Sequence, residues 1–157
     1  IHSSLKTDYN LVLCGSVRDE GEKLKALCTE IGIEDKVVFT GFVEDNDLPV
    51  FYNACDLFIY PSLYEGVGLP PLEAMSCKTA VITSNLSSIP EITKDNALLI
   101  DPFNKDELAN SILSLANNPD LLAEYEKKGY DNSLNFKWSK TAELTLNAYK
   151  ALSDSLT

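Results

Sequence analysis

The sequence predicts a doubly wound α/β domain, in which a Rossmann-like parallel sheet carries helices on both faces and further helices follow at the C-terminal end. Five short apolar runs alternate with segments of helix length, which is typical of parallel strands joined by crossover helices. The 157 residues suit one domain. Hydrophobic residues make up 45% and charged residues 24%, so the chain can bury a core and is not of the disordered class. We therefore expect residues 1–157 to form a single domain.

The elements of the first half are predicted from apolar spacing. Apolar runs at 11–14, 37–40 and 57–60 have the length and continuity of buried strands. Two sets of apolar residues lie between them at the spacing of one helix face, and Gly32 is placed to end the first helix. The sets are Leu24, Leu27, Cys28 and Ile31, then Leu48, Phe51, Tyr52 and Cys55.

The second half continues this alternation and then becomes helical. A helix is expected to begin at Pro70 and Pro71, because the fixed φ of proline suits a first turn, and strands follow at 80–83 and 97–100. Three helices are expected after the last strand. Their signals are a capping pair of Asn104 with Glu107, a start at Asn118-Pro119 with an end at Gly129, and a start at Ser139.

The charge balance excludes two classes of partner. Lys and Arg number 13 against 24 Asp and Glu, which gives a formal net charge of -11. Such a surface repels nucleic acid and anionic lipid. In addition, no apolar run approaches the roughly 18–20 residues of a membrane span. We expect neither nucleic-acid binding nor a span in this chain.

Few residues are available for metal or histidine chemistry. The four cysteines form no C-x-x-C pair and are interpreted as reduced core thiols of a cytosolic protein. His2 is the only histidine, which excludes a histidine metal site and a Ser/His triad. Arg18 is the only arginine; it is either a solvated residue at a helix start or a group that approaches a bound phosphate.

Residues 61–75 contain the candidate site, a glycine-containing loop between a strand and a helix. Ligands of doubly wound folds bind beyond the carboxyl ends of the strands. Gly66 and Gly68 would let backbone amides approach an anion or a sugar hydroxyl, and the carboxylates of Glu65 and Glu73 can accept hydrogen bonds. Each of these residues alone has an ordinary explanation as a turn former, a solvated side chain or a helix-dipole partner. Their joint spacing favours a ligand site.

Glu65, seven intervening residues and Glu73, within P-S-L-Y-E-G-V-G-L-P-P-L-E-A-M, resemble the donor-site signature of retaining glycosyltransferases of family four. Further similarity lies at 38–43, 54–58, 87–91 and 136–138. The resemblance implies one half of a GT-B fold, an enzyme that transfers a sugar from a nucleotide-sugar donor with retention, and no metal or other cofactor.

The resemblance also implies roles for individual residues. Glu65 would be the catalytic residue that binds hydroxyls of the donor sugar, and Glu73 would hold the ribose. The other donor-binding residues implied are the backbone of Gly66, Val67, Gly68 and Leu69 at the sugar and diphosphate, Gly15 and Ser16 in the nucleotide pocket, and Gly41, Phe42 and Val43 near the base. Val67 replaces the usual Phe of the family, and Lys78 replaces a Gly at a left-handed helix end.

The resemblance further implies that other residues needed for catalysis, and the acceptor-binding domain, are not in this sequence. An Arg and a Lys that grip the diphosphate would belong to a first strand and helix absent from this chain, and a missing N-terminal domain would bind the acceptor, a glycan or lipid. The full-length protein would act in cell-envelope polysaccharide synthesis, in the cytoplasm at the inner face of a membrane, and the fragment alone would be inactive.

Two other functions are compatible with parts of the sequence pattern to different degrees. A noncatalytic nucleotide-sugar-binding scaffold or sensor would keep the same fold and pocket and stays open. A nicotinamide dehydrogenase has little support, because the chain after the first strand reads G-S-V-R-D-E rather than G-x-G-x-x-G.

Overall fold

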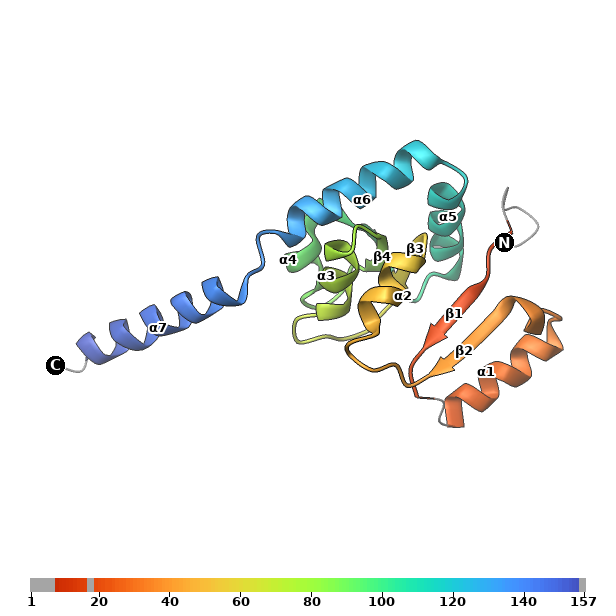
Figure 1. Ribbon diagram of the computed structural model, residues 1–157, viewed down its shortest axis with the longest axis horizontal. Coiled ribbons are helices and arrows are strands. Elements are labelled where there is room, and N and C mark those ends of the chain that lie inside the picture. The colour runs from red at the N-terminus through yellow and green to blue at the C-terminus, as the bar shows by residue number, and fades with distance from the viewer. Residues whose placement is uncertain (1–7, 17–18, 156–157) are drawn as a thin grey trace.

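The computed structural model describes residues 8–16 and 19–155 and has the expected α/β order (Figure 1). His2 and Arg18 lie outside the described residues. The elements are β1 (Leu11–Cys14), α1 (Asp19–Glu30), the 3-10 turn η2 (Glu34–Lys36), β2 (Val37–Gly41), α2 (Leu48–Ala54), β3 (Leu57–Tyr60), α3 (Leu69–Ser76), β4 (Ala80–Ser84), α4 (Ile89–Thr93), the 3-10 turn η3 (Lys94–Asn96), β5 (Leu98–Ile100), α5 (Lys105–Ala116), α6 (Pro119–Ser133) and α7 (Trp138–Ser155).

All five predicted strands form, but they are divided between two parallel sheets instead of one. β1 pairs with β2, while β3, β4 and β5 form the second sheet in that order. Within the described ranges no strand joins β1 to β3. The apolar side chains of β1 are accordingly exposed, with Leu11 at 45% and Val12 at 46%, whereas every residue of β4 is buried.

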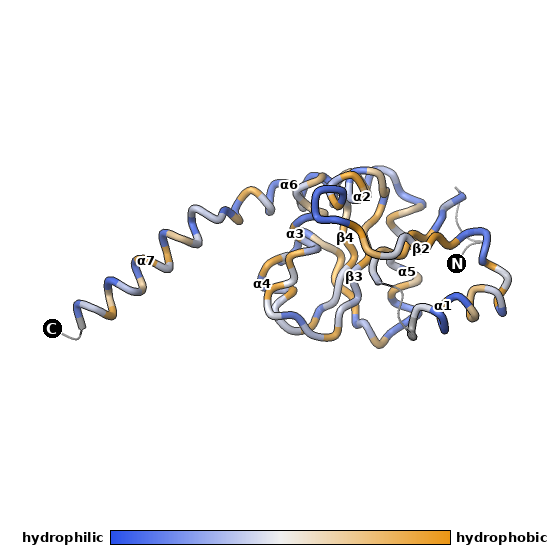
Figure 2. The backbone as a smooth tube through the Cα atoms, turned by 60° about the horizontal axis from the view of Figure 1, so that its bottom comes forward, coloured by the Kyte–Doolittle hydropathy of each residue, from blue (hydrophilic) through white to orange (hydrophobic). Residues whose placement is uncertain are grey.

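The core lies on both faces of the second sheet. Successive residues of β4 point to opposite faces. Val81 therefore packs with Leu72 and Met75 of α3, and Ile82 packs with Leu115 of α5. The hydropathy tube has hydrophobic stretches in the strands (Figure 2). Helices α2, α3 and α4 cover one face and α5 covers the other. Helix α6 begins beside α5, where Leu121 packs on the Ile82 cluster, and ends against α3, where Asn132 contacts Met75. Helices therefore lie on both faces, which confirms the doubly wound prediction.

The predicted helix signals are partly confirmed. The Asn104 side chain accepts a hydrogen bond from the Glu107 amide, and Asn118 accepts one from the Leu121 amide, as expected of N-caps. Gly129 does not end α6, which continues to Ser133. Instead, Gly129 lies where α6 packs closely on α3, because a Cβ at Gly129 would lie 2.9 Å from Met75 Cγ.

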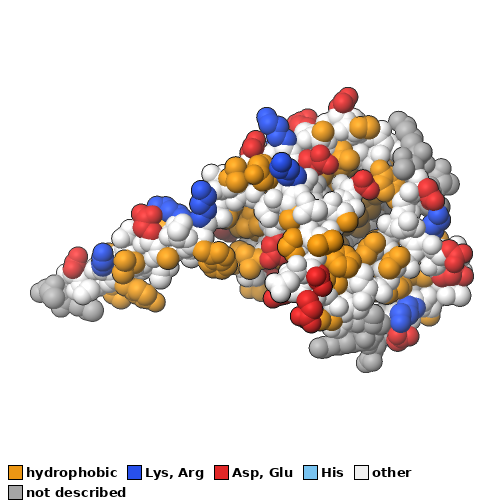
Figure 3. All heavy atoms as spheres, viewed as in Figure 1, with side chains coloured by type: hydrophobic (Ala, Val, Ile, Leu, Met, Phe, Trp, Pro, Cys, Tyr) orange, Lys and Arg blue, Asp and Glu red, His pale blue; other side chains and the backbone are white. Residues whose placement is uncertain are grey.

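Helix α7 begins at Trp138, one residue before the predicted start, and extends away from the sheets (Figure 1). Its hydrophobic side chains lie along one side of the helix in Figure 3 and are exposed, among them Leu144 at 57% and Tyr149 at 69%. No helix within residues 8–16 and 19–155 is long and apolar enough to cross a bilayer.

The cysteine interpretation needs a correction. All four cysteines are free thiols. However, Cys14 is exposed, and Cys28, Cys55 and Cys77 are only half-buried. For Cys14 and Cys28 the reason is that β1 and α1 have little packed against them, so their apolar positions are not core positions in the described chain. Cys77 packs at the edge of the core cluster of α3.

Candidate functional site

The predicted loop leaves the carboxyl end of β3 and enters α3 at Leu69, one residue before the expected Pro70. Gly68 caps this helix with φ 83°, a left-handed conformation, and a Cβ there would lie 2.5 Å from Ile89 Cδ1. Gly66 has no such constraint, because a Cβ would meet nothing within 4 Å. The fold therefore requires glycine at 68, whereas at 66 glycine leaves the backbone open to an approaching molecule.

The Glu65 carboxylate is held by two hydroxyl donors. Tyr60 Oη donates to Glu65 Oε1 at 2.5 Å, and Ser62 Oγ donates to the same oxygen at 2.8 Å. The hydrogen bond from Tyr60 is the main reason that the pKa of Glu65 is lowered, and the bond from Ser62 adds to it. Glu65 is therefore ionised at neutral pH and acts only as an acceptor.

The backbone of Glu65 is also fixed, by two serines at the loop after β4. The Ser87 and Ser88 hydroxyls donate to the Glu65 carbonyl oxygen at 2.7 and 3.0 Å. The Glu65 amide donates back to Ser87 Oγ at 3.3 Å. Ser87 has φ 59°, an unusual conformation for a residue with a side chain, which orients it toward Glu65.

Glu73 lies in the second turn of α3, not in the first turn as expected. Tyr52 Oη of α2 donates to Glu73 Oε2 at 2.9 Å. Tyr52 is 8% exposed, and its pKa is raised by burial first and by this hydrogen bond second. The position of Glu73 thus depends on a ring that belongs to the core, while its carboxylate reaches an exposed surface.

The two carboxylates belong to one neighbourhood. Burial, the hydrogen bond to Glu65 and the charges of Glu65 and Glu73 together raise the pKa of Tyr60 to about 12. Between Lys36 and Lys78 the sequence contains no Lys or Arg. The site described here is therefore anionic.

The other predicted residues form a second cluster at the carboxyl ends of β1 and β2. The Gly15 amide donates to the Gly41 carbonyl oxygen at 3.0 Å, which brings these loops together. Ser16 is exposed, Phe42 is 68% exposed and Val43 is half-buried. Among the described residues, no hydrogen bond joins this cluster to Glu65 or Glu73.

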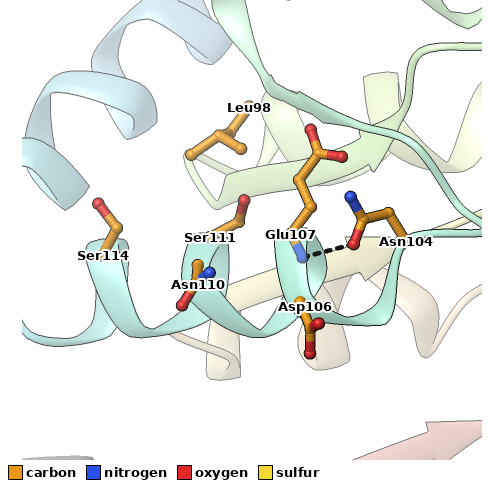
Figure 4. Close-up of a pocket in the computed structure, with 7 residues that line it drawn as sticks. All are labelled: Leu98, Asn104, Asp106, Glu107, Asn110, Ser111 and Ser114. Atoms are coloured by element: carbon orange, nitrogen blue, oxygen red, sulfur yellow. Dashed lines mark hydrogen bonds between the residues drawn. The ribbon is translucent and has the colours of Figure 1, made fainter.

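A cavity of about 560 Å³ lies elsewhere, beside α5 (Figure 4). Its lining contains the carboxylates of Asp106 and Glu107 and no basic side chain. Glu107 has structural partners, because its amide donates to Asn104 Oδ1 and its Oε2 accepts from the Asp101 amide. This lining would repel a diphosphate, and it includes none of the predicted site residues.

The sequence did not predict the residues that donate hydrogen bonds to the two glutamates. These are Tyr52, Tyr60, Ser62, Ser87 and Ser88. Tyr60 and Ser62 carried a usable signal, because both lie within five residues of Glu65 at a strand end. Tyr52 carried none, since it occupies an apolar position of α2.

Comparisons with known proteins identify the family of this chain. The sequence matches the family described as glycosyl transferases group 1 over residues 1–132. It is 38% identical over 144 residues to the O-antigen chain mannosyltransferase B of Escherichia coli, covering 92% of this chain and 38% of that protein. It is 34% identical over 155 residues to the serotype-specific mannosyltransferase WbdA of Escherichia coli, covering 98% of this chain and 19% of that protein.

The fold is similar to solved glycosyltransferase structures. The crystal structure of Anabaena HepE in complex with UDP and glucose superposes with a TM-score of 0.83 at 25% identity, covering 90% of this chain and 40% of that one. This chain thus spans well under half the length of these relatives. Because the family match extends over residues 1–132 and the relatives match nearly the whole chain, the chain belongs to the glycosyl transferases group 1 family.

Proposed function

We propose that this chain is the donor-binding part of a retaining glycosyltransferase that transfers a hexose from a nucleotide-sugar. One observation carries the proposal: Glu65, in the loop after β3, and Glu73, in the second turn of α3, are two carboxylates whose positions are fixed by hydroxyl donors. A sugar and a ribose present hydroxyl donors, which such carboxylates accept. Glu65 would bind the donor sugar and Glu73 the ribose.

The backbone around Gly68 would contact the sugar and diphosphate. Free amides at the start of a helix favour anions. Pro70 and Pro71 have no amide hydrogen, so the donors would come from the backbone of Gly66, Val67, Gly68 and Leu69. The second cluster would receive the nucleoside, with Gly15 and Ser16 beside it and the exposed ring of Phe42 near the base.

The anionic site needs cations, and the divided sheet suggests where they come from. A departing nucleoside diphosphate builds negative charge that enzymes stabilise with Arg, Lys or a metal ion. We propose that a further parallel strand and helix, from residues other than the described ones, fill the space between β1 and β3 and bring these cations. The exposure of Leu11 and Val12 supports this, because an apolar strand this uncovered is typical of an incomplete sheet.

The acceptor would be a glycan or lipid held by another domain, and residues 1–157 alone would bind the donor without transferring it. Two relatives are named mannosyltransferases, one of them of O-antigen chains, which supports a hexose donor and a role in polysaccharide synthesis. Four free cysteines suit a reducing compartment, so we place the reaction in the cytoplasm. Transfer without a metal predicts that activity persists in EDTA.

Donor binding and transfer by the full-length protein test this function. UDP and GDP, each alone and joined to a hexose, are titrated by calorimetry, and the anomeric configuration of the product is read by NMR. Glu73→Gln should weaken binding of every nucleotide, and Glu65→Gln should abolish transfer. Glu143→Gln, on the exposed face of α7, is the matched control. Absence of nucleotide binding would refute the function, and binding without any transfer would favour the noncatalytic module.

A further inference from the structure

An aromatic row links the two glutamates of the site. The rings of Tyr52 and Phe58 meet edge to face with centroids 5.2 Å apart, and those of Phe58 and Tyr60 stack with centroids 6.0 Å apart. Tyr52 belongs to α2, while Phe58 and Tyr60 lie two residues apart on one face of β3. The row therefore has a phenol at each end and a phenyl ring in the middle.

Each phenol meets one carboxylate. Tyr60 Oη donates to Glu65 Oε1, which also accepts from Ser62, so both hydroxyls hold the same oxygen and Oε2 is left for another donor. Tyr52 Oη donates to Glu73 Oε2. The Tyr52 carbonyl accepts from Thr79 Oγ1 at 2.6 Å, which ties this end of the row to the residue before β4. Tyr52 is thus held both at its hydroxyl and at its backbone.

The protonation states suit this arrangement. Burial, followed by the hydrogen bond to Glu73, raises the pKa of Tyr52, and the pKa of Tyr60 is raised to about 12. Both phenols therefore keep their protons at neutral pH and remain donors. The carboxylate of Glu65 is ionised and can accept.

We propose that Tyr60 and Tyr52 are positioning residues of the donor site: Tyr60 fixes Glu65 for the sugar, and Tyr52 fixes Glu73 for the nucleoside. This rests on the proposed function. A free glutamate has several rotatable bonds, and ordering them on binding lowers affinity. A carboxylate that is already oriented avoids this cost. The two ends of the row thus act on different parts of one ligand.

Removing one hydroxyl at a time tests the proposal. Tyr60→Phe and Tyr52→Phe keep the rings in the row, and Tyr125→Phe, half-buried against the core of the opposite sheet face, is the control. The full-length protein is titrated with UDP, UDP-glucose, GDP and GDP-mannose. We expect Tyr60→Phe to weaken binding of the preferred nucleotide-sugar about tenfold and leave the nucleoside diphosphate unchanged, since a bond to a charged group is lost. Tyr52→Phe should weaken both by a similar factor.

A purely structural role gives a different pattern. If Tyr60→Phe lowered the affinity for nucleoside diphosphate as much as for nucleotide-sugar, or changed neither, the positioning role of Tyr60 would be overturned. A wild-type protein that binds no nucleotide would refute the proposed function itself. In that case the carboxyl pKa of Glu65, followed by carbon NMR, still decides on the contact: it rises in Tyr60→Phe if the phenol holds the carboxylate, and an unchanged value contradicts it.

Discussion

The most informative stability experiment concerns Gly68, the residue that caps α3 at the candidate site. Alanine at this position meets two obstacles: φ is 83°, and its Cβ would lie 2.5 Å from Ile89 Cδ1. A left-handed conformation costs a residue with a side chain about 1–2 kcal/mol. Overpacking against a fully buried Ile89 adds about 1–3 kcal/mol. Gly68→Ala should therefore lower the free energy of unfolding by about 2–5 kcal/mol.

Two other glycines separate these effects. Gly32 has φ 68° but open space around a Cβ, so Gly32→Ala should cost only the conformational part, about 1 kcal/mol. Gly66 has neither a positive φ nor a close neighbour. Gly66→Ala should therefore leave stability within about 0.5 kcal/mol of the wild type.

Urea unfolding followed by circular dichroism measures all three variants. With a slope of about 2 kcal/mol per molar urea, Gly68→Ala should shift the midpoint down by about 1–2.5 M. Equal losses in the Gly68 and Gly32 variants would refute the role of the Ile89 contact. A loss in Gly66→Ala as large as that in Gly68→Ala would refute the reasoning altogether.

Three further predictions concern the core, a helix cap and pH. Leu115→Ala, at a fully buried position, should cost about 2–5 kcal/mol in urea unfolding, while Leu144→Ala on exposed α7 should change little; similar losses would contradict the assigned core. Asn118→Ala should cost about 1 kcal/mol by removing the cap of α6, with Asn118→Ser restoring most of it. Because folding raises the pKa of Tyr60 from 10.0 to about 12, the native protein keeps this proton to a higher pH than the unfolded chain does. The contribution of Tyr60 to stability is therefore full below pH 10 and is lost toward pH 12. Tyr60→Phe should flatten that decline, and an unchanged pH profile would contradict the shift.

The strands could be predicted because each is a continuous apolar run, but their division into two sheets could not. Residues 11–14 are as apolar as residues 80–83, and periodicity therefore predicts equal burial. In the structure β4 is buried throughout and β1 is mostly exposed. The difference arises from what packs beside each strand, which a run of apolar residues does not encode. The same reason explains why Cys14 and Cys28 are not core residues, since they lie in β1 and α1, which have little packed against them.

Gly129 shows a second limit of sequence patterns. A glycine near the end of a helical pattern is a common C-terminal signal, yet this one lies inside α6 because Met75 of α3 comes too close for a Cβ. Helix ends and close helix contacts both favour glycine, so the residue type alone does not distinguish them. The caps at Asn104 and Asn118 were predictable because their partners are only three residues away.

In the candidate site, too, the local pattern could be predicted from the sequence and the distant contact could not. Glu65 and Glu73 stand out in the sequence, whereas Tyr52 reaches Glu73 from 21 residues away. Phenylalanine would satisfy the apolar pattern of α2 equally well, so that pattern gives no reason for the hydroxyl. A buried phenol needs a hydrogen-bond partner, and the exposed Glu73 carboxylate supplies it only when α2 and α3 pack together. If the Tyr52 hydroxyl had no role beyond the core, Tyr52→Phe would remove a buried polar group and release the Glu73 side chain, with little loss of stability. The Tyr52 hydroxyl is better explained by our proposal that it orients Glu73. The ligand affinity of Tyr52→Phe, and not its free energy of unfolding, therefore distinguishes a positioning role from a purely structural one.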